Sequence, residues 1–269
     1  MMLESIQLLC TGVVMGLFGG LLGLGGSTIM IPALVMVFGE NQHLYQAAAM
    51  ICNFVVGISS LVPHWTSQAL VKPILKSLIP AAIAGILLGV AISNVSFFEG
   101  RNSVWLARCF GVFLIYVLIY NCWRLFQPAR PMHENAEAHL PSGYPFWSAG
   151  IGLVTGFAAG LLGIGAGTIS TPLQQVILKL PIRRAMSNSA ATIVGISWLG
   201  AIYKNGTLPE HGIMVTESLK IALWVIPTGL IGGYIGGHLM HRLPRNVVRI
   251  LFIVVLILAI WNLLLVKPR

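Results

Sequence analysis

Long apolar stretches separated by short polar or basic turns occupy most of this chain. They fall at about 6–38, 45–62, 78–95, 104–126, 146–178, 186–203, 219–240 and 246–266. A helix needs about 20 apolar residues to cross the hydrocarbon core of a bilayer, and most of these stretches are close to that length. The pattern predicts a polytopic helical membrane protein without a soluble domain.

The first and fifth stretches are too long for one straight crossing. The first contains Gly23, Gly25 and Gly26, followed by Pro32. A helix that ends near Leu22, a short unwound turn and a second half-helix from about Ser27 fit this composition better than one continuous helix. Two arrangements remain open: a single span broken by glycines, or a helical hairpin that enters the membrane and returns.

The two long stretches carry the same motif. Residues 16–32 read GLFGGLLGLGGSTIMIP, residues 156–172 read GFAAGLLGIGAGTISTP, and nine of the seventeen positions are identical. Later landmarks return in the same order, with Val-Gly-Ile-Ser in the second and sixth stretches and Pro80, Gly85 and Gly89 matched by Pro227, Gly232 and Gly236. We therefore predict an all-α protein with two homologous halves of about four segments, 1–126 and 146–269, joined by a polar linker at 127–145.

The distribution of basic residues bears on how the halves are oriented. Eight single spans would divide the Lys and Arg residues eight to eight, which orients nothing. If each half instead opens with a hairpin, each half crosses the membrane three times and the second half is inverted. Ten Lys and Arg residues then lie on one side of the membrane and six on the other. The richer side is cytoplasmic by the positive-inside rule. We expect inverted repeats, since only this arrangement gives a charge bias.

Composition narrows the range of functions. The chain is 57% apolar and only 9% charged, with a mean hydropathy of +0.87. Its net charge of +9 comes from residues scattered over loops and helix ends, which is their usual place in membrane proteins, so we expect no nucleic-acid binding. Four separate cysteines, the lack of Asp and the absence of enzyme motifs predict no catalysis, cofactor or metal.

The breaks in the two long stretches are the candidate site. The N-terminus of a half-helix presents free N–H groups and the positive end of the helix dipole, which suits an anion. Glycines let backbone approach a ligand, and hydroxyls and amides can donate to its oxygens. The predicted binding residues are Gly23, Gly25, Ser27, Thr28, Asn53, Gly163, Gly165, Thr168, Ser170, Ser187 and Asn188. The alternative is that the glycines only pack helices and the polar side chains only join them.

Two copies of Gly-Leu-Leu-Gly-x-Gly-(Gly/Ala)-(Ser/Gly)-Thr-Ile-x-x-Pro, each opening a four-segment half, resemble the TauE/SafE sulfite exporter family. Ala185-Met-Ser-Asn-Ser189 also resembles a small, hydroxyl-rich stretch of that family, whereas Ala47-Ala-Ala-Met-Ile51 departs from it. The resemblance implies a multi-pass transporter of a bacterial or archaeal inner membrane for sulfite, sulfoacetate or a related anion.

An exporter that works by alternating access at the broken helices is our expectation for the function. Its partners would be the lipid bilayer and the small sulfur-containing anion. The alternatives are an importer of such anions and a non-transporting structural or assembly subunit. The Gly-x-x-x-Gly faces at Gly85/Gly89 and Gly232/Gly236 would serve packing within the chain or a homodimer.

Overall fold

The computed structural model describes residues 2–23, 25–95, 103–126 and 140–239, with isolated positions between 247 and 261. Within these ranges the regular structure is entirely helical. The elements are α1 (Met2–Leu22), α2 (Ser27–Phe38), α3 (Gln42–Thr66), α4 (Lys72–Ser93), α5 (Ser103–Leu125), α6 (Tyr144–Leu162), α7 (Gly167–Val176), α8 (Ile182–Thr207), the 3-10 turn η3 (Leu208–His211) and α9 (Val215–Leu239).

Six of the described helices, α1, α3, α4, α6, α8 and α9, are long and apolar enough to cross a membrane. Large apolar side chains such as Ile119, Trp147 and Leu223 are exposed on the outside of the bundle, as a lipid-facing surface requires. The predicted all-α, multi-pass membrane protein is thereby confirmed. Residues 127–139 of the predicted linker, and most of the predicted eighth stretch, lie outside the described residues.

Each half opens with a helical hairpin. In the first, α1 ends at Leu22, yet Gly26 packs on Met15, about two turns back along the same helix. In the second, Leu178 lies just after α7 and belongs to a buried cluster against which Tyr144, the first residue of α6, also packs. The chain therefore reverses at each glycine-rich break. Of the two arrangements that the sequence leaves open, the structure has the hairpin.

The central helices α3 and α8 run in opposite directions. Gln46, near the start of α3, accepts a hydrogen bond from Lys204 near the end of α8. At the other end of the pair, His64 of α3 lies 3.1 Å from the hydroxyl of Ser187 near the start of α8. These helices occupy equivalent places in the two halves, and an inverted repeat requires their directions to be opposite. Inversion of the whole repeat relative to the bilayer stays a prediction.

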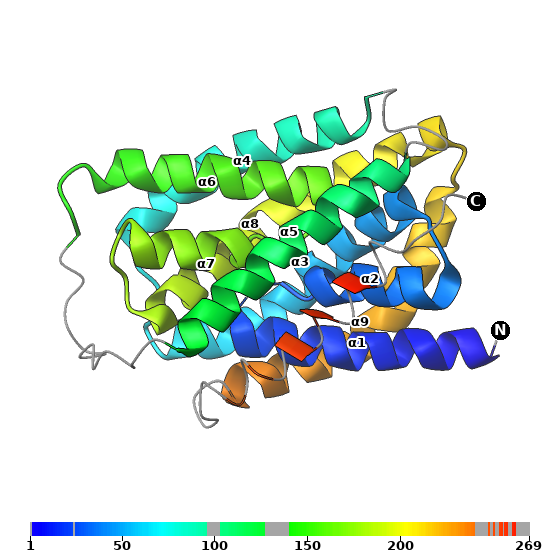
Figure 1. The fold of residues 1–269 in the computed structure, drawn as a ribbon, viewed down its shortest axis with the longest axis horizontal. Helices are drawn as coiled ribbons and strands as arrows, with labels where there is room; N and C mark the ends of the chain where they lie inside the picture. Colours follow the sequence, from blue (N-terminus) through cyan, green and yellow to red (C-terminus); the bar gives the residue numbers. More distant parts are fainter. Residues whose placement is uncertain are drawn as a thin grey trace.

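The halves interlock instead of lying side by side. The pair α4 and α6 lies along one edge of the bundle and the pair α1 and α9 along the other (Figure 1), so each half lends one helix to each pair. A Cβ added to any of four repeat-related glycines would lie within 3.0 Å of a carbonyl oxygen of the facing helix: Gly85, Gly89, Gly232 and Gly236. The predicted close-packing faces are confirmed, and they act within the chain.

Adding one methyl group tests this close packing. A Cβ at Gly156 of α6 would overlap the carbonyl oxygen of Ala82 on α4, and backbone cannot move aside as a flexible side chain can. We expect Gly156→Ala to lower the thermal unfolding midpoint of the detergent-purified protein, at an overpacking cost of about 1–3 kcal/mol.

Gly150→Ala is the matched control on the same helix. Gly150 is exposed and has nothing within 4 Å of an added Cβ. Ala is favoured over Gly in helices by about 1 kcal/mol, so this variant should unfold at the wild-type midpoint or slightly above it. Equal midpoints for the two variants would contradict the close contact of α6 with α4.

Candidate functional site

The first break is shaped by glycines. Gly23 and Gly25 have φ angles of 59° and 81°, a region of backbone conformation that L side chains rarely adopt. Gly25 is also confined by its neighbour, because a Cβ added there would lie 2.6 Å from the Cα of Gly165. The sequence places glycine where the chain must both reverse and touch another backbone.

The two breaks meet inside the bundle. The contact between Gly25 and Gly165 joins the α1–α2 break to the α6–α7 break. Gly23 then packs on Met186 of α8, and Gly163 packs on Gln46 of α3. Each break is therefore supported by the central helix of the opposite half. The structure brings the predicted glycines of both copies into one region.

Two helix N-termini begin at this meeting point. α2 starts at Ser27 after Gly26, α7 starts at Gly167 after Ala166, and neither N-cap residue makes a side-chain hydrogen bond. The first N–H groups of a helix have no partner within it, and they carry the positive end of the dipole. Both half-helices thus present partial positive charge at the breaks.

Ser27 and Asn53 form a reciprocal pair. The backbone N–H of Ser27 donates to Asn53 Oδ1 at 3.2 Å, and Asn53 Nδ2 donates to the Ser27 hydroxyl at 2.8 Å. Both side chains are buried, and Asn53 lies near the middle of α3. This pair fixes the start of α2 at mid-helix depth. The sequence predicted both residues at the site, and the structure joins them.

The repeat-related threonines differ in their contacts. Thr168 donates its hydroxyl to the carbonyl oxygen of Gly165 at 3.1 Å. Thr28 is equally buried, but among the described residues its hydroxyl has no hydrogen-bond partner. Leaving a buried hydroxyl unsatisfied costs about 1–3 kcal/mol. Thr28 is therefore suited to meet a water or ligand oxygen at the start of α2.

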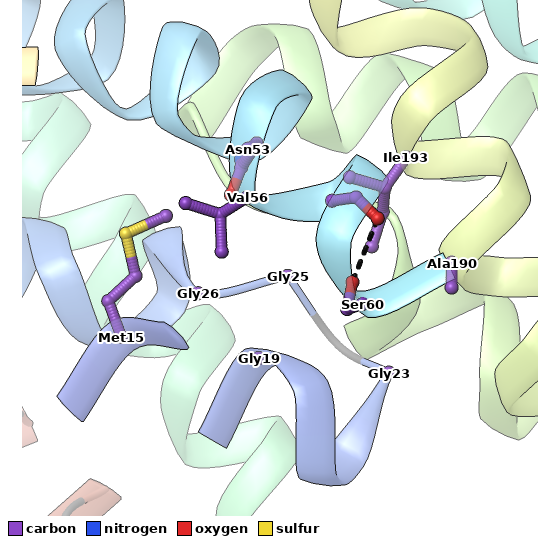
Figure 2. Close-up of a pocket in the computed structure, with 11 residues that line it drawn as sticks. Met15, Gly19, Gly23, Gly25, Gly26, Asn53, Val56, Ser60, Ala190 and Ile193 are labelled. Atoms are coloured by element: carbon purple, nitrogen blue, oxygen red, sulfur yellow. Dashed lines mark hydrogen bonds between the residues drawn. The ribbon is translucent and has the colours of Figure 1, made fainter. Parts of the chain in front are cut away.

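A pocket lies beside the first break, between α1, α3 and α8 (Figure 2). The room inside it is about 10 Å³, roughly what one water molecule needs. Its lining residues are Met15, Gly19, Gly23, Gly25, Gly26, Asn53, Val56, Gly57, Ser60, Ala190 and Ile193. Exposed backbone and a few polar side chains in an apolar wall are typical of a small-molecule site.

Three predicted residues of the second half lie in a different polar network. Gln174 of α7 donates to the hydroxyl of Ser170 at 2.7 Å and accepts from the amide of Asn188 at 3.0 Å. Asn188 in turn accepts from the backbone N–H of Val71 at 2.9 Å, while Ser187 contacts His64. These contacts tie α7 and α8 to α3 and to the start of α4. They favour a structural role, and binding by these three residues stays a prediction.

Lys204 and Gln46 were missed by the sequence analysis. The sixth stretch was predicted to end at 203, which left Lys204 among the loop charges. The structure continues α8 to Thr207 and leaves only 1% of Lys204 exposed. The available signal was the helical spacing of Gln46 and Asn53, two amides on one face of an apolar helix.

The chain is similar to membrane transporter proteins over most of its length. A probable membrane transporter protein, YunE of Bacillus subtilis, is 24% identical over 95% of this chain and 96% of its own length. The probable membrane transporter protein MamO of Paramagnetospirillum magneticum is 26% identical over 91% of this chain. This chain spans only 42% of that relative's length. The comparisons support membrane transport and describe no enzyme. No solved structure matches the chain.

One family profile, described as sulfite exporter TauE/SafE, matches residues 8–263. The match includes both hairpins, both central helices and the pocket between them. Because it covers nearly the whole sequence, this protein belongs to the TauE/SafE sulfite exporter family.

Proposed function

We propose that this protein exports a small sulfur-containing anion, such as sulfite or sulfoacetate, by alternating access at the paired breaks. Its family and its transporter relatives support membrane transport. The names of those relatives give no substrate, so the anion and its direction are argued from the site.

The observation that carries the proposal is the meeting of two half-helix N-termini at the contact between Gly25 and Gly165. Irregular backbone at membrane depth is tolerated only where protein buries it or where it lines a cavity. Here the first break does line a pocket, and no Asp or Glu is among that pocket's described lining residues. Partial positive charge without a carboxylate favours an anion over a cation.

Alternating access requires the breaks to face the two sides of the membrane in turn. The pairs α1–α9 and α4–α6 are each locked by glycine contacts, so each is expected to move as a unit. The contact between Gly25 and Gly165 lies between these units. It is made by backbone atoms alone, so no interlocking side chains hold the two breaks together. Relative movement of the pairs would therefore open the site at this contact.

Ligand binding at the breaks is tested by thermal unfolding of the purified protein with sulfite, sulfoacetate, sulfate, thiosulfate or chloride. A ligand that binds only the folded state stabilises it by about 2.7 kcal/mol at 100 times its Kd. We expect a sulfur anion to raise the midpoint, and the double variant Thr28→Val with Thr168→Val to weaken this effect by removing two hydroxyls at similar volume.

Thr228→Val is the control for indirect effects. It removes a hydroxyl of α9 that donates to the carbonyl oxygen of Leu9 at 2.8 Å, outside the pocket lining, so it should lower stability by about 1 kcal/mol while leaving the anion's Kd unchanged. If no anion in the panel raises the wild-type midpoint at saturating concentration, the breaks serve packing alone and the anion proposal fails.

Transport itself is tested by anion flux in liposomes under an imposed membrane potential. An inside-negative potential favours outward movement of each negative charge by about 2.3 kcal/mol per 100 mV. We expect outward anion flux to rise with that potential, and the double threonine variant to reduce it. A flux that is indifferent to the potential would contradict electrogenic export, and flux that requires an inward ion gradient would favour import.

A further inference from the structure

A stripe of polar side chains follows one face of α3. The stripe consists of Gln42, Gln46, Asn53, Ser60 and His64. Successive members are separated by four or seven residues, which is the spacing of neighbours on one side of a helix. The stripe faces α8 at both ends, through the contact of Gln46 with Lys204 and that of His64 with Ser187. The pocket at Asn53 lies between these two ends. The seam between α3 and α8 is thus polar well beyond the pocket.

Lys204 is a lysine buried in this seam. Its Nζ donates to Gln46 Oε1 and, at 2.7 Å, to the hydroxyl of Ser93 on α4. Both acceptors are neutral, and among the described residues no carboxylate contacts Lys204. A charged side chain inside a membrane protein is costly unless it is paired, and such residues usually mark a functional path.

Hydrogen-bond donors outnumber acceptors around Lys204. An ammonium has three protons to donate. Within the described part of the chain, Lys204 has two acceptors, Gln46 and Ser93. Gln46 is fully buried, and its Nε2 has no partner there. One turn earlier on α3, Gln42 is 1% exposed, and neither atom of its amide has a partner among the described residues. A ligand with several oxygen atoms could accept hydrogen bonds from these buried donors.

This group of donors adjoins the second break. The side chain of Gln46 lies against Gly163, where a Cβ would be 2.5 Å from its Cγ. The pocket of Figure 2 adjoins the first break instead, and none of Gln42, Gln46 and Lys204 lines it. An anion that moves along the α3–α8 seam from the pocket would therefore meet Lys204 beside the α6–α7 break.

We propose that Lys204, with the amides of Gln46 and Gln42, forms a second binding site for a small oxyanion at this end of the α3–α8 seam. The proposal rests on the proposed function, because it assigns the transported anion to this site. The proposal also predicts selectivity. Anions with several oxygen atoms, such as sulfite and sulfate, should bind to this site more tightly than chloride.

The test is titration of the detergent-purified full chain with sulfite, sulfate, thiosulfate and chloride, by calorimetry and thermal unfolding. Lys204→Met removes the charge at similar length, and we expect it to raise the oxyanion Kd about tenfold or more. Lys204→Arg keeps the charge and should stay within a few-fold of wild type. Lys220→Met is the control, since it removes an exposed lysine at the start of α9.

Gln46→Leu keeps the test informative if Lys204→Met does not fold. It removes the Gln46 amide, which donates to none of the described residues, and leaves the lysine in place, so it should also raise the oxyanion Kd, with little change for chloride. Oxyanion Kd values at the wild-type level in folded Lys204→Met, or in Gln46→Leu if that lysine variant does not fold, would overturn the proposal and make Lys204 a structural link between α3, α4 and α8.

The threonine variants separate this inference from the proposed function. If the double threonine variant weakens binding and Lys204→Met does not, the break site stands and the lysine site falls. If Lys204→Met weakens binding and the threonine variant does not, the lysine site stands and the break site falls. Absence of any oxyanion binding by the wild-type chain would overturn both.

Discussion

The structure depends on how unwound backbone is accommodated inside a bilayer. Each half interrupts its first apolar stretch with glycines, and the N–H groups at the start of α2 and α7 lack partners within their helices. Hydrocarbon cannot satisfy them. The fold places both breaks against each other at Gly25 and Gly165, supports them on α3 and α8, and encloses them between the pairs α1–α9 and α4–α6. The surrounding helices thus shield the breaks from lipid.

The halves share their architecture, but the chemistry at their breaks differs. Ser27 is held by Asn53, and the Thr28 hydroxyl has no partner within the described ranges, whereas Thr168 is bonded to its own break and Ser170 to Gln174. The pocket accordingly adjoins the first break, and the buried lysine lies near the second. The repeated motif predicts a duplication, and the two breaks carry different polar groups. Such asymmetry suits a transporter whose two access states face different solutions.

Much of this arrangement could be predicted from the sequence, because the bilayer limits the choices. Apolar stretches locate the helices, the repeated glycines locate the breaks, and Ser27 and Asn53 stand out as polar residues in apolar surroundings. Hairpin and broken span remained unresolved, since both need the same apolar length. Asn188 bonds to Val71, 117 residues away, and no local pattern reveals such a partner. Lys204 resembled a loop charge, because hydropathy does not tell which face of a helix end is covered by neighbours.

The interlocked pairing has a consequence for biogenesis. The glycine face of α1 is covered by α9, whose last turns are synthesised more than 200 residues after α1. Until α9 is made, the glycine face of α1 is in contact with lipid. The first half also leaves its own α4 without a partner until α6 is made. Insertion and tertiary assembly are therefore separated in time, and a ribosome that stops after the first half releases two helices whose partners do not yet exist.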